Sequence, residues 1–507
     1  INGSILVDNA YAYLYDSSVD TPTDYTSSTT TNGGNYCTLN DLAKSGQINL
    51  SNGATEASSD ANQHDAVLGT FALNSGKWYF EMQLKNGAAA PDVGWQESDY
   101  TRDMLRNFNG GQRLGGYCIA TDGNNNNIRS FNNGTMTTIS ATSWATGDVI
   151  GCAIDMDAKK IWFRKNGGAW YAATNGGTSG DPATGSNPTL SYTYTGLLTP
   201  RTSAYGSSYT PIVNFGARGS FTYSPPSGYK ELCTKNLPIP SIKNSGKYFQ
   251  ATEWDGNGSA RSITTTVKDP DWIWIKRQAN SNHHVLFDKV RGVYKRLMAN
   301  LTNTEDSGNG DGVVYGFGTE SFDVDGNSNV NSSGAAYTGY IWDTGASTVN
   351  NTNGNVYSQV RASTTTGISV VKYTGNGGTG TVGHGLSSAP EMIWCKDRDG
   401  TTNWFVYMTL LGSSALQLNS DGGGFSPSPA GINSANATTF NLGGNRGETN
   451  TNGNDYIAYC MHSVPGFSRV GMYYGNGSSD GSFVPLDFRP SFVMHKRYDT
   501  GGTNVGD

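Results

Sequence analysis

The stretch SGKWYFEMQL, Ser75 to Leu84, decides the fold of the first half of the chain. Within it, Trp78, Phe80 and Met82 alternate with Tyr79, Glu81 and Gln83, so the apolar residues share one side. Successive side chains of a β-strand point to opposite faces of the sheet. The alternation therefore predicts a strand with one apolar face.

Similar short patterns follow, in VGW (Val93 to Trp95), GGYCIATDG (Gly115 to Gly123) and GDVIGCAIDMDAKKIWFRKNGGAW (Gly147 to Trp170). The last of these contains Asn166-Gly167, a dipeptide typical of a tight turn after a strand. Short strands separated by Gly and Asn turns predict a β-sandwich.

The order of these motifs resembles the SPRY domain: GKWYFE, then GW, GGY, GDVIGCAID and IWFRKNG, within residues 76–167. The resemblance implies a concanavalin A-like sandwich that binds partners and performs no chemistry. We therefore expect an all-β protein, with a SPRY-like sandwich followed by tandem β-domain repeats.

The composition supports rigid β-structure with polar loops: charged residues are 15%, aromatics 11%, and 67 of the 507 residues are glycine. The net charge of −7 and the lack of a basic run argue against nucleic acid as a partner, because phosphates are bound by Lys and Arg. No apolar stretch reaches the length of a membrane-spanning helix, so we expect no membrane insertion. The only helical candidate of more than two turns is Val290 to Leu301. None of the six cysteines lies in a CxxC pair and most lie in apolar runs, which predicts buried free thiols.

Three segments in the second half align with one another. They are YFQATEWDGNGS with DPDWIWIKR (248–259, 269–277), ISVVKYTGNGG with APEMIWCKD (368–378, 389–397), and FSRVGMYYGNGS with RPSFVMHKR (467–478, 489–497). A second landmark, strand–Gly/Asn loop–strand, recurs at 322–343 and 440–461. The repeat of roughly 100 to 120 residues is too long for a solenoid coil and large enough for a small β-domain.

The third copy stops before its second landmark. Either the chain continues beyond the printed sequence, which we expect, or the third segment supplies strands that complete the second copy. Because the chain begins with Ile1, we also expect a preceding region. The predicted organisation is a linker (1–34), a SPRY-like sandwich (35–232), a Pro-containing linker (233–246), repeat 1 (247–362), repeat 2 (363–465) and an incomplete repeat 3 (466–507).

The flanks of the sandwich, NYCTLN (35–40) and FTYSPPSGYKELCTKNLPIPSI (221–242), resemble repeat-bearing virion structural and tail proteins of marine bacteriophages. The resemblance implies a virion protein on the tail or capsid exterior that contacts other virion proteins. We expect a tail fibre or adhesion protein that binds host-surface glycan or protein, as a homo-oligomer, with a trimer as the expected state. The alternatives are a capsid decoration or head-fibre protein and a polysaccharide depolymerase.

Little in the sequence indicates catalysis. HExxH and a P-loop are absent. A glycosidase would need two carboxylates across a cleft, for which Asp92, Glu97, Asp99 and Asp103 are the candidates, but their spacing does not establish such a pair. We expect no enzymatic activity and no cofactor.

The loop QESDYTRDMLRNFNGGQR (96–113) is the best candidate for binding, because SPRY-like modules contact partners through loops and because Tyr and Arg favour interfaces. The candidate residues are Trp95, Tyr100, Arg102, Arg106, Phe108 and Arg113. The alternative is that Trp95 belongs to the core and that the loop packs on a neighbouring copy.

A weak metal candidate lies in DVDGNSN, where Asp323, Asp325 and Asn327 alternate as at the start of a calcium loop. The twelfth position is Gly334, which cannot supply the closing carboxylate, and the matching segment of repeat 2 has no acidic residue. We therefore expect no metal.

Overall fold

The computed structural model describes residues 35–499, apart from 61–63, 87–90, 99–112, 123–126, 141–142, 175, 207–208, 218–219, 239, 280, 308–311, 428–429, 476, 478, 480 and 487. In these residues the regular structure is β-strand and short 3-10 turns, which confirms the predicted all-β class. No helix in this part of the chain is long and apolar enough to cross a membrane. The chain divides into two compact units, residues 1–239 with 472–487 and residues 240–471 with 488–507.

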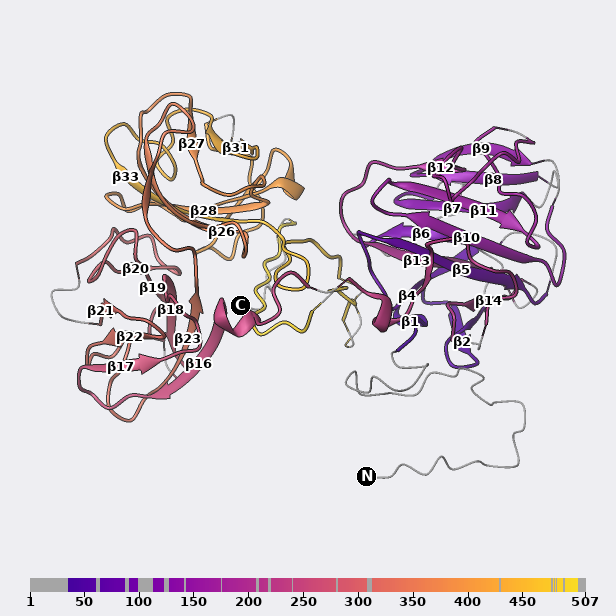
Figure 1. Cartoon of the computed structure of the whole chain (residues 1–507). Helices are drawn as coiled ribbons and strands as arrows, with labels where there is room; N and C mark the ends of the chain where they lie inside the picture. Colours follow the sequence, from indigo (N-terminus) through magenta and orange to yellow (C-terminus); the bar gives the residue numbers. More distant parts are fainter. Residues whose placement is uncertain are drawn as a thin grey trace. The chain divides into compact units, whose positions relative to one another are not determined.

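The first unit is a sandwich of two β-sheets, in which neighbouring strands are often not consecutive in the sequence (Figure 1). One sheet contains, in spatial order, β1 (Leu39–Lys44), β4 (His64–Gly69), β13 (Leu198–Tyr205), β6 (Asp92–Glu97), β7 (Gly116–Asp122), β8 (Asn127–Asn132) and β9 (Thr135–Ser140). The other contains β12 (Leu190–Ser191), β11 (Lys160–Lys165), β10 (Val149–Asp155), β5 (Lys77–Leu84), β14 (Pro211–Asn214), β3 (Glu56–Ser59) and β2 (Ile48–Ser51), and β15 (Lys230–Glu231) pairs with β5.

Strand β5 lies near the middle of its sheet, between β10 and β14, and is buried on both faces. Trp78, Phe80 and Met82 enter the core between the sheets, as the alternation predicts. The opposite face is also covered, since Tyr79 and Glu81 are 0% and 2% exposed. The segment after β14 covers this opposite face. The alternation of residues within β5 does not predict that covering.

The second unit contains two β-modules with the same strand order (Figure 1). In the first module, one sheet contains β16 (Phe249–Asp255), β23 (Ala336–Trp342), β18 (Trp272–Arg277), β19 (Val285–Asp288) and β20 (Leu297–Met298), and a small sheet contains β17 (Arg261–Thr264), β22 (Ser321–Val324) and β21 (Val314–Phe317). In the second module, the matching strands are β26 (Ile368–Thr374), β33 (Asp455–Met461), β28 (Met392–Asp397), β29 (Phe405–Met408) and β30 (Ala415–Gln417), with β27 (Gly380–Gly383), β32 (Thr439–Leu442) and β31 (Ile432–Ala435) in the small sheet. Strands β24 (Val349–Asn351) and β25 (Ser358–Ser363) extend the larger sheet of the second module.

The repeat alignment is confirmed for the first two copies by side-chain contacts that recur at matching positions. In the first copy, the Asn331 amide donates to Asn257 Oδ1 (2.8 Å) and to the carbonyl of Ser259 (2.6 Å). In the second, Asn450 donates to Asn376 Oδ1 (3.0 Å) and to the carbonyl of Gly378 (2.6 Å). The Gly-Asn-Gly turn thus recurs in both copies because the side-chain oxygen of its Asn accepts a hydrogen bond from the buried Asn side chain.

We expect Asn331→Ala and Asn450→Ala to destabilise their modules by similar amounts, about 1–3 kcal/mol each, because each leaves buried polar groups unpaired. Guanidinium unfolding of the full chain, followed by amide exchange in each module, measures both values. Asn433→Ala, at an exposed position of β31, should change stability by less than about 0.5 kcal/mol. A large loss in one module with none in the other would contradict the equivalence of the two networks.

The two modules pack through corresponding faces of their larger sheets, in an aromatic interface. The Trp272 ring lies between Trp342, with ring centroids 4.3 Å apart, and Tyr459 of the second module, 4.6 Å away. Trp274 and Trp394, which are matching residues of the two copies, also meet, with their centroids 5.8 Å apart. The contact joins the two copies into one apolar cluster.

Next to this interface, His284 accepts a hydrogen bond at Nδ1 from Trp274 Nε1, 2.9 Å away. Burial, with help from Lys276 and His283, lowers the pKa of His284 to about 4. In the unfolded chain the pKa is about 6.5. Between these values only the unfolded state takes up the proton, so stability should fall as pH drops from about 6.5 towards 4.

We expect this loss to be on the order of 1 kcal/mol, because His284 is only partly buried and solvent screens its charge. Urea unfolding of the second unit at pH 7, 5.5 and 4.5 measures it. His284→Asn should flatten the pH dependence in this range, whereas His495→Asn, at an exposed position, should not. An unchanged slope in His284→Asn would contradict the assignment.

One sequence expectation requires correction. The segment from Val290 to Leu301 is not helical; it contains turns and the short strand β20, and Tyr294 has a left-handed φ of 65°. Among the described residues from 467 to 499 there is no strand, although the sequence there matches the first half of a repeat. The segment therefore does not supply strands to complete the second copy, whose sheets are formed by strands within residues 349–461.

The physical reason is a lack of flanking strands. In the complete copies, β18 lies between β23 and β19, and β28 lies between β33 and β29. The matching stretch at 489–497 has no such neighbours among the described residues. Phe492, at the position matching Trp272, nevertheless packs on an aromatic face of the first module, against Tyr340 and Trp342. The boundaries predicted for repeat 3 remain a prediction.

All six cysteines are free and buried, as predicted.

Candidate binding site

The structure describes two of the six candidate binding residues, Trp95 and Arg113, and both are buried. Trp95 is 0% exposed, because it lies on the inward face of β6, where its ring meets the edge of Phe80 at 5.7 Å. Arg113 is 5% exposed, because it turns inward to Asp92. Neither side chain offers surface to a partner. Tyr100, Arg102, Arg106 and Phe108 lie outside the described residues, and their role stays a prediction.

A buried ionic cluster holds both ends of this loop. Asp92, on β6, accepts from Arg113 Nε at 2.9 Å and from Arg201 Nη2 at 3.2 Å. Arg201 Nη1 also donates to Gln96 Oε1 (2.6 Å), and Gln96 Nε2 donates to the carbonyl of Leu114 (3.1 Å). Gln96 and Arg113, the two end residues of the 96–113 segment, are therefore connected through one hydrogen-bonded cluster.

Burial alone would raise the pKa of the Asp92 carboxyl, but the guanidinium groups of Arg201 and Arg113 outweigh it and lower the pKa. The carboxylate stays charged and paired in the interior, which suits an anchor and not a proton donor. Of the other carboxylates considered for glycoside hydrolysis, Glu97 accepts from the hydroxyl of Tyr117 at 2.5 Å. Asp99 and Asp103 lie outside the described residues.

The weak metal candidate is a hydrogen-bonded turn. Asp325 Oδ2 accepts from the backbone amides of Gly312 (2.8 Å) and Val313 (3.2 Å), and Oδ1 accepts from the amide of Asn327 (3.1 Å). Asp323 lies on β22. Nowhere in the described part of the chain do three or more His, Cys, Asp or Glu residues gather as they would around a metal ion.

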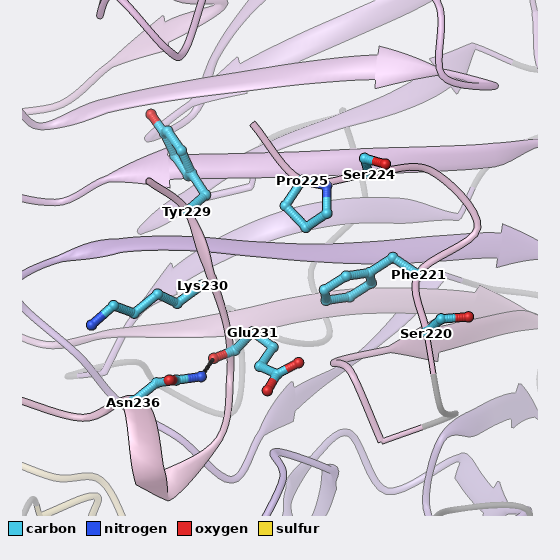
Figure 2. Close-up of a pocket in the computed structure, with 8 residues that line it drawn as sticks. All are labelled: Ser220, Phe221, Ser224, Pro225, Tyr229, Lys230, Glu231 and Asn236. Atoms are coloured by element: carbon cyan, nitrogen blue, oxygen red, sulfur yellow. Dashed lines mark hydrogen bonds between the residues drawn. The ribbon is translucent and has the colours of Figure 1, made fainter. Parts of the chain in front are cut away.

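A pocket of 470 Å³ lies on the outer face of the sheet that contains β5 (Figure 2). The chain forms it after β14, where it folds back over the sheet. The lining residues are Ser220, Phe221, Ser224, Pro225, Tyr229, Lys230, Glu231 and Asn236.

The first wall, residues 220–225, is fastened to the sheet by two side chains. The Glu81 carboxylate accepts from the backbone amides of Thr222 (2.7 Å) and Tyr223 (2.8 Å). Arg164 Nη2 donates to the carbonyl of Ser224 at 2.6 Å. Phe221 then packs edge-to-face on Tyr79, with ring centroids 4.9 Å apart.

The second wall, residues 229–236, is fastened by the sheet itself. Strand β15 pairs in parallel with β5, with Lys230 opposite Trp78. The Tyr229 hydroxyl donates to the carbonyl of Pro182 at 3.1 Å, and Asn236 Nδ2 donates to the carbonyl of Glu231 at 3.1 Å. Both walls are thus held in place by the fold.

The sequence pattern did not indicate this pocket, because residues up to 232 were predicted to belong to the sandwich and residues 233–246 to a Pro-containing linker. The available signal was the aromatic content of the same stretch, Phe221, Tyr223 and Tyr229. Linkers contain few aromatic residues, since these residues lose most by exposure to water.

The sandwich is a SPRY-type module, because the family model of the SPRY domain matches residues 77–178. The SPRY-like, concanavalin A-like prediction for this half is therefore supported. The chain itself belongs to the family described as domain of unknown function DUF7483, whose model matches residues 244–505, more than half of the chain.

Solved structures of low similarity to this chain are also SPRY domains. The SPRY domain of human HERC1 has 17% identity and a TM-score of 0.26, with 35% of this chain and 96% of that chain covered. The PSpry domain of TRIM65 has 12% identity and a TM-score of 0.24, with 35% and 91% covered. Comparison with curated proteins gave no match.

Proposed function

We propose that this protein is a non-enzymatic virion protein of a bacteriophage, a tail fibre or related adhesion protein that binds the host surface through loops of its SPRY sandwich. The phage setting rests on the resemblance of the two flanks of the sandwich, 35–40 and 221–242, to virion and tail proteins. Its place is the exterior of the tail or capsid, as a homo-oligomer in contact with other virion proteins.

The observation that carries the binding role is the anchoring of the 96–113 loop. A loop that contacts a partner works best when a rigid scaffold positions it. Here Asp92, Arg113 and Arg201, all buried, tie the end of the loop to the centre of a sheet. The loop sequence between these points is rich in Tyr, Arg and Phe, which favour interfaces.

The test replaces residues 99–112 with a Gly-Ser linker of equal length, which leaves Asp92, Arg113 and Arg201 unchanged. The purified chain should bind host cells and block phage adsorption, and the replaced chain should lose both properties while its sandwich unfolds at the same denaturant concentration. Met136→Ala, an exposed position of β9 in the same sheet, is the matched control. Full adsorption blocking by the replaced chain would contradict the proposal.

A capsid decoration or head-fibre protein is the second candidate. Binding to purified capsids without binding to host cells would support it. Release of oligosaccharides from the host envelope would instead indicate a depolymerase.

A further inference from the structure

The pocket beside β5 belongs to neither matched family region, since its lining residues, 220–236, lie between 178 and 244. We propose that this pocket is a binding site for a neutral pyranose sugar. The site is separate from the 96–113 loop and does not depend on the phage setting.

The apolar part of the pocket consists of the rings of Phe221, Pro225 and Tyr229. A pyranose presents C–H groups on its faces and hydroxyls around its edge, so it needs a ring surface bordered by polar groups. Figure 2 shows the Phe221 ring and the Glu231 carboxylate pointing into the same space, with Pro225 beside them. The volume of 470 Å³ suits one or two sugar rings.

The polar part contains groups whose hydrogen-bonding capacity is still available. Glu231 Oε1 is paired with Lys235 at 3.0 Å, whereas Oε2 has no partner among the described residues. Asn236 Nδ2 donates to the carbonyl of Glu231, and no hydrogen bond from a described residue to Asn236 Oδ1 is seen. The hydroxyls of Ser220 and Ser224 supply further donors and acceptors at the opposite rim. These groups match the alternating donors and acceptors of vicinal sugar hydroxyls.

The charges of the pocket favour an uncharged ligand. Its lining contains one carboxylate, Glu231, and one ammonium, Lys230. The lining therefore carries no net charge, which suits a ligand without a net charge of its own.

The surroundings argue against an extended peptide as the ligand. Peptides that bind to sheets usually add a strand at a free edge. Beside this pocket, β5 is already paired with β10 on one side and with β14 and β15 on the other. The first wall is already held by Glu81 and Arg164, and the second by the pairing of β15 with β5, so little ordering is needed for a small rigid ligand to bind.

The experiment is saturation-transfer NMR on the full chain with lactose, maltose, cellobiose and N,N′-diacetylchitobiose as probes. At least one probe should receive saturation at its ring C–H protons. Phe221→Ala, which removes the ring surface, and Glu231→Gln, which removes the carboxylate, should each weaken its binding roughly tenfold or more. Tyr357→Ala, which removes a 54% exposed ring elsewhere, should leave binding unchanged.

Because Phe221 also packs on Tyr79, its removal can lower stability as well as binding. A third variant separates these two effects. Ser224→Trp adds a side chain at an exposed lining position and should block the probe without removing a core contact. Lack of transfer to all four probes, or unchanged binding in Phe221→Ala and Ser224→Trp, would overturn the proposal. If binding disappears only when residues 99–112 are replaced, the sugar binds at the loop, which overturns this inference and supports the proposed function.

Discussion

Asp92→Asn should destabilise the sandwich by about 3–5 kcal/mol, the largest effect we expect from one substitution in the first unit. Asp92 and Arg201 are 0% and 1% exposed, and Arg113 joins them at 5%. Removal of the carboxylate charge takes away the buried counterion that the two guanidinium groups share. Water cannot reach them without opening of the sheet, so the folded state bears the cost.

Guanidinium unfolding, followed by amide exchange in β6 and β13, measures this loss. The matched control is Asp41→Asn. Asp41 also pairs with a cation, Lys44, at 2.6 Å, but its side chain is 72% exposed. Its removal should cost less than about 1 kcal/mol. A similar, small loss in both variants would show that the buried cluster does not stabilise the sandwich.

The same substitution separates stability from binding. Asp92→Asn should also increase amide exchange at both ends of the 96–113 loop, because the links through Arg113 and Gln96 depend on the cluster. At concentrations of denaturant where the sandwich is still folded, we expect weaker binding to the host surface.

Trp272→Ala should destabilise the second unit by about 3–5 kcal/mol, because it removes a fully buried indole and leaves a cavity between the two modules. Trp272 is 1% exposed and stacks on Trp342 and on Tyr459. Its removal weakens both the core of one module and the contact with the other. We expect the two modules to unfold together in the native chain because of this contact, and to unfold in two separate transitions in Trp272→Ala.

Unfolding of the full chain, with amide exchange resolved for each module, distinguishes these outcomes. Tyr357→Ala is the control, since Tyr357 is 54% exposed and should contribute less than about 0.5 kcal/mol. A single transition with an unchanged midpoint would contradict the role given to the interface.

The buried charges of this interface support the same view. Arg291 of the first module donates to Asp288 at 2.5 Å and to the hydroxyl of Tyr459 in the second module at 3.3 Å. The Tyr459 hydroxyl in turn donates to Asp288 at 2.8 Å. The contact between the modules thus combines stacked rings with a closed hydrogen-bond triangle, which favours one relative orientation of the two modules.

The sequence by itself determined the features that depend on local pattern. Alternation in 75–84 identifies β5 and its core face, and the recurrent Gly-Asn-Gly turns identify two equivalent modules. Both follow from short-range rules, the two-residue period of a strand and the conformational demands of a tight turn. The motif order of the first half was sufficient to expect a SPRY-like sandwich.

Only the tertiary structure decided which side chains remain available to a partner. Arg113 has the sequence environment of a binding residue, yet it is buried, because it pairs with Asp92 inside the sandwich. Arg201, from a strand distant in the sequence, pairs with the same carboxylate. Residues 221–236 span the predicted boundary between the sandwich and a Pro-containing linker, yet they form a pocket, because Glu81, Arg164 and the pairing of β15 with β5 hold them on the sheet. Such contacts form between segments far apart in sequence, so no local pattern specifies them. Whether a chemically suitable residue faces water or the interior is decided by the partners that the fold brings to it.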